Sequence, residues 1–204
     1  MKLYYAPGTC SLAPHIALRE AGLEFGLEKV DLGTRKTEGG ADFTAVNANG
    51  YVPALDLDGG EVLTEGPAIV QYIADRKPAA NLAPANGTLA RARLQEQLNF
   101  ISTELHKSFS PLFKSDSTEA EKDKARAKVR SRFDHVERLL SDRRAYLAGD
   151  AFTVADAYLF TVARWTKPTG IGLDNWPHLK DYVARVAARP AVQAALKAEG
   201  LQAA

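Results

Sequence analysis

The residue with the clearest capacity for chemistry in this 204-residue chain is its single cysteine, Cys10. It follows Ala6-Pro7-Gly8-Thr9 and precedes a stretch with helical spacing, so we expect it at a strand-to-helix turn. Unpaired backbone N–H groups and the positive end of a helix dipole there favour a thiolate over a thiol. A free cysteine can equally be a small buried hydrophobic residue, so its position leaves both roles open.

The residues after Cys10 limit the redox chemistry that it could perform. They read Cys10-Ser11-Leu12-Ala13, without the second cysteine of a dithiol motif. One cysteine also excludes an internal disulfide and a cysteine-rich metal cage. Redox chemistry at Cys10 would therefore need a thiol from another molecule.

Two further segments could bind a small molecule. Tyr51-Val52-Pro53-Ala54 directly precedes a predicted strand, and Leu63-Thr64-Glu65-Gly66-Pro67 predicts a helix start. The N–H groups of a helix start can hold a carboxylate, and Glu65 beside them can hold an ammonium group. The pair would suit an α-amino acid head. Taken alone, Glu65 is more simply interpreted as a charge that complements the helix dipole.

The elements that would position these residues form an α/β arrangement. We predict a strand, a helix, a strand, a hairpin and a final helix, at residues 2–5, 11–20, 27–32, 54–57 with 61–63, and 67–76. The first three make a βαβ unit with parallel strands. This order is that of the thioredoxin fold.

The rest of the chain predicts an all-helical domain. Apolar residues at helical spacing indicate one long helix over 91–113 and another that includes 125–140, and three more helices start near 153, after 176 and near 190. Turn residues at 78–87 predict a linker between domains 1–77 and 88–204. The net charge changes near it, from −4 over residues 1–80 to +5 over 81–204.

The long helix carries a narrow polar stripe. At about 100° per residue, Asn99, Thr103, His106 and Ser110 fall within about 60° of one another, beside the apolar face. Such a stripe suits the wall of a cleft. A second interpretation places His106 at the edge of the core, without a chemical role.

Composition excludes several classes of function. A net charge of +1 argues against a nucleic-acid-binding protein. The basic residues at 122–132 scatter around a helix and are diluted by Glu119, Glu121, Asp123 and Asp134, so we interpret the stretch as a solvated surface. No signal peptide or membrane span is visible, which predicts a cytoplasmic protein. His15, His135 and His178 share no spacing, and we expect no metal site.

The ordered set of Cys10, Val52-Pro53 and Glu65-Gly66 resembles the cytosolic glutathione transferases, and in particular the bacterial beta class. The resemblance extends over essentially all 204 residues and includes Thr103-Glu104-Leu105-His106-Lys107 and the capping-box segment 149–156. It implies a thioredoxin-like α/β N-terminal domain that binds glutathione and an all-α C-terminal domain that forms the pocket for an electrophile.

The resemblance also implies roles for individual residues. Glu65 and the Gly66 backbone would hold the γ-glutamyl head of glutathione, and Val52, before a cis Pro53, would bind its cysteinyl unit through the main chain. Arg35 would reach the glycyl carboxylate, where many relatives have lysine. Many relatives have serine at the Gly66 position, so the γ-glutamyl head would be bound less tightly here. Further glutathione contacts would come from the helical domain, at Asn99, Thr103 and Lys107.

The activity implied is detoxifying conjugation of the glutathione thiolate to small, mostly apolar electrophiles. We favour Cys10 as the catalytic residue, assisted by His106, with Tyr5 and Ser11 as alternative residues that stabilise the thiolate. Cys10 could also form a mixed disulfide with glutathione, for thiol transfer or peroxide reduction. The second substrate would contact Phe109, Phe113 and Trp165, and homodimers are expected. Other hypotheses are a non-catalytic ligand-binding or assembly module and a glutaredoxin-like reductase, which Ala13 disfavours.

Overall fold

The computed structural model describes residues 1–202 and divides the chain into two compact units. Unit 1 contains residues 1–83 together with the described residues from 188 onward, and unit 2 contains residues 84–187. The predicted division differs, because it assigned every residue from 88 to the helical domain. The reason is that the last helix, α8 (Pro190–Ala198), packs against α1 (Leu12–Glu20) of unit 1.

Unit 1 is built on one five-stranded sheet with the order β3-β2-β1-β4-β5. Its strands are β1 (Lys2–Tyr5), β2 (Gly26–Asp31), β3 (Lys36–Thr37), β4 (Ala54–Asp56) and β5 (Val62–Thr64). β1 and β2 are parallel and the other neighbours are antiparallel. The predicted βαβ unit and hairpin are therefore confirmed. The strand β3 was not predicted, because two residues are too few to show an alternating pattern.

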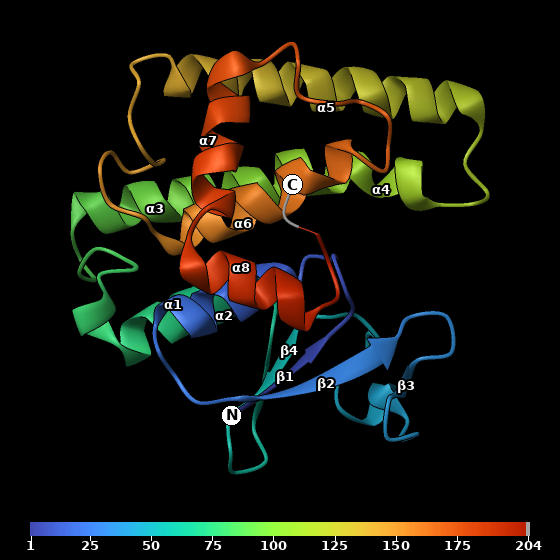
Figure 1. Ribbon diagram of the computed structural model, residues 1–204. Helices are drawn as coiled ribbons and strands as arrows, with labels where there is room; N and C mark the ends of the chain where they lie inside the picture. Colours follow the sequence, from blue (N-terminus) through green and yellow to red (C-terminus); the bar gives the residue numbers. More distant parts are fainter. Residues whose placement is uncertain (203–204) are drawn as a thin grey trace. The chain divides into compact units, whose positions relative to one another are not determined.

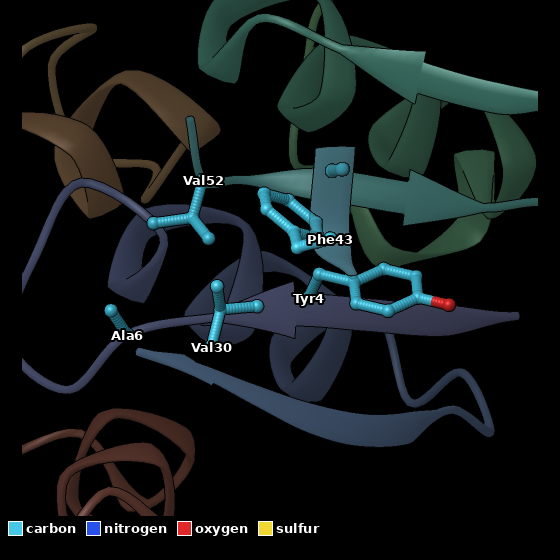
Figure 2. Close-up of a cluster of buried hydrophobic side chains, with 6 residues drawn as sticks. Tyr4, Ala6, Val30, Phe43 and Val52 are labelled. Atoms are coloured by element: carbon cyan, nitrogen blue, oxygen red, sulfur yellow. The ribbon is translucent and has the colours of Figure 1, made fainter. Parts of the chain in front are cut away.

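One face of this sheet is covered by a loop segment rather than by a long helix. Tyr4 and its cross-strand partner Ala54 share the face with Val30. Phe43, from a single turn of 3-10 helix, and Val52 cover it, and Figure 2 shows their side chains directed toward this cluster. The buried Val52 side chain thus fixes the segment that precedes Pro53 against the sheet.

The opposite face is covered by helices, because side chains alternate along a strand. Leu3 and its partner Leu55 are fully buried on that side. The helix α1 packs against α2 (Gly66–Arg76) and α8, and the three lie together beside the sheet (Figure 1). Arg189 and Glu20 join the start of α8 to the end of α1 by an ion pair of 2.6 Å.

Unit 2 is helical, as predicted. Its long elements are α3 (Leu89–Asn99), a π-helical segment (Phe100–His106), α4 (Lys107–Phe113), α5 (Glu119–Leu140), α6 (Val154–Ala163) and α7 (Pro177–Ala187). The predicted apolar face of α5 is buried at Ala125, Val129, Phe133, Val136 and Leu140. The helices α4 and α5 pack against each other (Figure 1).

The predicted long helix over 91–113 is helical throughout, but not all of it is α-helix. A π segment separates α3 from α4, and Pro111 lies inside α4. Hydrogen bonds in a π turn run from i to i+5, so each turn holds an extra residue and rotates the side chains that follow. The angles predicted for the polar stripe therefore do not apply to its second half.

In unit 2, the starts of α5 and α6 carry capping boxes. Thr153 and Asp156 form the predicted box before α6, with Asp156 Oδ2 accepting from Thr153 N at 2.7 Å. The other oxygen of this buried carboxylate accepts from Leu147 N and Tyr182 Oη. Of the helices within residues 1–202, none has the length and apolar character needed to cross a membrane.

The basic stretch of α5 agrees with a solvated surface. Lys122 pairs with Glu119 at 3.0 Å, and Arg126 pairs with Asp123 at 2.7 Å. Arg132 pairs with Glu104 outside the helix, so acidic side chains neutralise several of the basic residues of α5.

Candidate active site

The register of the sheet brings together the segments that contain Cys10, Val52-Pro53 and Glu65-Gly66. Ala54 pairs with Tyr4 on one side and with Thr64 on the other. Val52-Pro53 therefore lies between the chain that leaves β1 toward Cys10 and the chain that leaves β5 toward Glu65. Residues that are distant in sequence meet at the same end of three neighbouring strands.

Cys10 lies in the turn between β1 and α1, as predicted. Its Sγ donates to the carbonyl oxygen of Val52 at 3.3 Å, and its side chain is partly exposed. Val52 is buried, and the Val52–Pro53 peptide bond is cis, as the resemblance implied. Within residues 1–202 no acceptor is found for the Val52 backbone N–H, which leaves it able to donate to a ligand.

Ser11 and Tyr5, the alternative residues for stabilising a thiolate, lie in surroundings that differ from those of Cys10. The Ser11 hydroxyl is fully buried, and it donates to Ala6 O and accepts from Ala6 N, each at 3.1 Å. Tyr5 lies on the α1 side of the sheet, with its ring 6.2 Å from that of His15. Burial, followed by the charge of Glu199, raises the Tyr5 pKa above its usual value. Of the three residues, Cys10 is the one directed toward Val52.

Glu65 and Gly66 form the start of α2. Glu65 has a φ of 68°, a conformation that residues other than glycine rarely adopt and that is often found at functional sites. Its carbonyl oxygen accepts from Ala68 N and Ile69 N, while its side chain is exposed. The space beside the Gly66 Cα is open to 4 Å, and Pro67 follows at the start of the helix. The Gly66 N–H and the Glu65 carboxylate are thus both accessible.

Arg35 reaches the same region from the loop after β2. Asp31 Oδ1 accepts from Gly33 N and Thr34 N at 2.8 Å each, which shapes the turn before Arg35. Arg35 has a φ of 56°, and its side chain lies against Gly50, with atoms 3.2 Å from where a Cβ on that glycine would stand. The guanidinium group is therefore placed close to the segment that contains Val52.

A buried network that the sequence analysis missed supports the loop before Cys10. Glu199, after α8, accepts from Gly8 N at 2.9 Å and contacts His15 Nδ1 at 2.8 Å. Arg19 Nε donates to His15 Nε2 at 2.9 Å, so the neutral ring carries its hydrogen on Nδ1 and donates it to Glu199. No sequence signal marked Glu199, because its partners are almost 200 residues away.

In unit 2, His106 is the last residue of the π segment and is held by aromatic side chains. Its Nδ1 lies 2.7 Å from Tyr158 Oη, and its ring meets that of Trp165 edge-on at 4.7 Å. Burial, with a smaller effect of the neighbouring Lys107 charge, lowers the His106 pKa to about 4. The imidazole is therefore neutral at neutral pH.

The other predicted residues of unit 2 divide into accessible and buried ones. Asn99, Thr103 and Lys107 are exposed, and Thr103 Oγ1 donates to Asn99 O at 2.9 Å. Phe109 is fully buried, Trp165 is 7% exposed, and Phe113 is 54% exposed. Phe113 meets Trp165 edge-on at 5.6 Å, so this pair presents an aromatic surface.

Within the described part of the chain, no cluster of three or more His, Cys, Asp or Glu side chains could hold a metal ion. The groups that meet in unit 1 are the Cys10 thiol, the Glu65 carboxylate, the Arg35 guanidinium and backbone N–H groups. These are groups that bind a charged peptide and act on a sulfur.

Comparisons with known proteins agree with these features. Residues 8–76 match the family model of the glutathione S-transferase N-terminal domain, and residues 100–190 match that of the C-terminal domain. The glutathione S-transferase GstA of Escherichia coli O157:H7 is 48% identical over 202 residues, which cover 99% of this chain and 100% of GstA.

Solved structures of glutathione S-transferases are also similar to this chain. The beta-class glutathione S-transferase of Sphingomonas chungbukensis is 52% identical with a TM-score of 0.96, over 99% of this chain and 100% of that one. A sphingomonad glutathione S-transferase complexed with glutathione is 51% identical with a TM-score of 0.95, over the same shares of the two chains. The chain therefore belongs to the glutathione S-transferase family.

Proposed function

We propose that this protein conjugates the thiolate of glutathione to small, mostly apolar electrophiles. The observation that carries the proposal is the meeting of Cys10, Val52 and the start of α2 at one end of the sheet. The distance of 3.3 Å between Cys10 Sγ and Val52 O is the contact that ties the first two together. The similar sphingomonad transferase complexed with glutathione supports the choice of this tripeptide.

Each group of glutathione has a counterpart in unit 1. The Glu65 carboxylate would bind the α-ammonium of the γ-glutamyl head, and the Gly66 N–H at the helix start would bind its α-carboxylate. The Val52 N–H, which has no acceptor within residues 1–202, would bind the main chain of the cysteinyl unit. Arg35 would bind the glycyl carboxylate, as guanidinium groups bind carboxylates in general.

The reaction proceeds from the bound thiol. Glutathione loses its sulfur-bound proton to solvent, and the thiolate attacks an electrophilic carbon. A new C–S bond forms as the leaving group departs with its electron pair. His106 would donate a hydrogen bond to the sulfur, with Asn99, Thr103 and Lys107 as further contacts to glutathione. Phe113 and Trp165 would contact the electrophile, with the buried Phe109 behind them.

Cys10 adds a second activity to the proposal. Its thiolate would attack the glutathione sulfur of a mixed disulfide between glutathione and another thiol. The other thiol leaves as its thiolate, and a Cys10–glutathione disulfide forms. A second glutathione thiolate would then displace the Cys10 thiolate and leave as oxidised glutathione. Each step exchanges one S–S bond for another, so glutathione itself is the reductant.

Calorimetric titration of the whole protein with glutathione tests the binding proposal. Glu65→Gln should weaken binding about 10-fold or more, because it removes a charge-assisted contact with the ammonium group. Glu61→Gln, on an exposed residue beside β5, is the matched control and should bind as the wild type does. Equal affinities of Glu65→Gln and the wild type for glutathione would show that Glu65 does not bind the γ-glutamyl head.

The two activities are separated by Cys10→Ala. Thiol transfer from a glutathionylated peptide should disappear, while conjugation of chlorodinitrobenzene should persist in part. Unchanged thiol transfer would disprove the mixed disulfide. Glutathione binding without conjugation of any of a panel of electrophiles would instead favour a non-catalytic binding module.

We further propose that the protein acts in the cytoplasm as a homodimer, as the resemblance implies. Light scattering on the purified protein should give about twice the chain mass of 22.1 kDa. A mass equal to one chain at micromolar concentration would refute the dimer.

A further inference from the structure

The buried residue Asn47 lies in the loop that leads to Val52, and both ends of its side-chain amide make hydrogen bonds. It is 7% exposed, although asparagine is mostly found at protein surfaces. Its Nδ2 donates to the carbonyl oxygen of Tyr51 at 2.7 Å, and its Oδ1 accepts from the backbone N–H of Asn49 at 3.1 Å. The Tyr51 oxygen can only accept and the Asn49 N–H can only donate, so one orientation of the amide satisfies both.

The backbone of Asn47 is attached to the core of unit 1. Its N–H donates to the carbonyl oxygen of Phe43 at 3.0 Å, and its own carbonyl oxygen accepts from Gly50 N at 2.8 Å. The Phe43 side chain is fully buried, and Figure 2 shows it directed toward the same cluster as Val52. From this fixed position, the Asn47 amide can orient the peptide group between Tyr51 and Val52.

The hydrogen bond to the Tyr51 oxygen sets the direction of the Val52 N–H, because both groups belong to one peptide unit. Within residues 1–202 the cis peptide bond is Val52–Pro53, so the Tyr51–Val52 bond is trans. The C=O and N–H of a planar trans peptide point in opposite directions. The Tyr51 oxygen points at the buried Asn47 amide, and the Val52 N–H therefore points away from it. In this part of the chain that N–H has no acceptor.

The opposite orientation of this peptide group would remove the donor that glutathione needs. With the group turned by half a turn, the Tyr51 oxygen would stand where the Val52 N–H now stands. That oxygen would repel a carbonyl of a bound peptide, and Asn47 Nδ2 would lose its acceptor inside the protein. The next peptide group is held as well, because Cys10 Sγ donates to the Val52 oxygen at 3.3 Å.

We propose that Asn47 is a positioning residue, whose side-chain amide holds the Tyr51 carbonyl oxygen and so directs the Val52 N–H toward the cysteinyl unit of bound glutathione. The inference rests on the function proposed above, in which this N–H binds the main chain of glutathione. Asn47 acts through the Tyr51–Val52 peptide group and does not touch the tripeptide. Its contribution is to the binding of glutathione rather than to the chemistry of the sulfur.

Crystal structures of the protein without glutathione test the orientation of the peptide group. In the wild type, the Tyr51 oxygen should point at Asn47 Nδ2. Asn47→Asp keeps the shape of the side chain and an acceptor for the Asn49 N–H, but it puts an oxygen in place of the donor. Because that oxygen would repel the Tyr51 oxygen, the Tyr51–Val52 peptide group should rotate in this variant. The pairing of β1 with β4 should stay unchanged.

Calorimetry and steady-state kinetics test the consequence for glutathione. Asn47→Asp should weaken glutathione binding and raise the KM for glutathione about 3- to 10-fold, the effect of losing one oriented hydrogen bond. The kcat with chlorodinitrobenzene at saturating glutathione should stay within about 2-fold of the wild type, because the groups that act on the sulfur are intact. Asn47→Ala removes the amide without adding a charge and should weaken binding by a similar factor.

Asn49→Asp is the matched control for the added charge. It places the same charge in the same loop, on an exposed side chain, and it leaves the backbone N–H that donates to Asn47 Oδ1 in place. This variant should bind glutathione as the wild type does. A loss of affinity equal to that of Asn47→Asp would assign the effect to charge and overturn the inference.

Two further results would overturn the inference. One is a wild type without glutathione whose Tyr51 oxygen points away from Asn47, which decides the matter even if no variant folds. The other is a folded Asn47→Asp that binds glutathione as tightly as the wild type, in which case the inference alone fails. If the wild type binds no glutathione, the proposed function fails whatever the orientation of the Tyr51–Val52 peptide group.

Discussion

Burial of the His106 ring makes stability depend on pH. Its pKa is about 4 in the folded chain against an ordinary value of 6.5, so the unfolded chain takes up a proton that the folded chain refuses. The free energy of unfolding should therefore fall as the pH decreases from about 6.5 to about 4, by up to about 3 kcal/mol from this residue. Urea unfolding of the wild type and of His106→Asn at a series of pH values measures it.

The difference in the free energy of unfolding between the wild type and His106→Asn isolates the contribution of His106, because the same carboxylates titrate in both proteins. His106→Asn should lose less stability than the wild type between pH 6.5 and pH 4. Parallel curves for His106→Asn and the wild type would contradict the buried, neutral ring.

The open space beside Gly66 predicts that a serine there improves glutathione binding. No atom lies within 4 Å of where a Cβ would stand, and the backbone there is not in the left-handed region, so the side chain adds no strain. Its hydroxyl could donate to the carboxylate of the γ-glutamyl head. Gly66→Ser should tighten glutathione binding about 3- to 10-fold by calorimetry. Ala68→Ser, in the same first turn, should have no effect, and weaker binding by Gly66→Ser would place the head elsewhere.

Some individual residues could be predicted from their types and order, and others could not. Cys10, Val52 and Glu65 stand in short segments whose turn residues predict a strand or helix end. The positive φ of Glu65 carries no local signal, because glutamate is a poor choice for that conformation. The contact of Tyr158 with His106 could not be predicted either, because every residue of the helix that holds Tyr158 is buried.

At the scale of elements, α8 stabilises the loop that holds Cys10. The Glu199 carboxylate satisfies Gly8 N and His15 Nδ1 inside the protein. Glu199→Ala would deprive both donors of that partner, and His15 is fully buried, so the cost should be about 3 kcal/mol. Chemical unfolding should show a large loss of stability, and hydrogen exchange should increase at Gly8. Lys197→Ala, on the exposed side of α8, is the control, and equal stability of the two variants would refute the role of the network.

The long helical stretch of unit 2 shows what periodicity can and cannot predict. Leu94, Leu98, Ile101 and Leu105 are all buried as their spacing predicted. The π segment at Phe100–His106 was missed, because one extra residue in a turn leaves the apolar pattern readable. Its position matters, since π turns are often found at functional sites and this one ends at His106.

At the scale of the molecule, sequence order predicted the sheet and most of the helices. Parallel β1 and β2 follow from a strand-helix-strand order, and the β4–β5 hairpin follows from Asp58-Gly59-Gly60. The membership of α8 in unit 1 could not be predicted, because helical periodicity shows which face is buried and not which partner buries it. The partly buried pair Arg189–Glu20 and the buried pair Glu199–His15 join it to α1.

The central claim is that glutathione binds where β1, β4 and β5 bring Cys10, Val52 and Gly66 together. Backbone amide spectra of the full chain, recorded during a titration with glutathione, test it most directly. The account predicts that the Val52 and Gly66 amide signals shift most, saturate together and shift much less in Glu65→Gln at the same glutathione concentration. Signals of Val52 and Gly66 that stay in place while glutathione saturates another part of the chain would contradict the account.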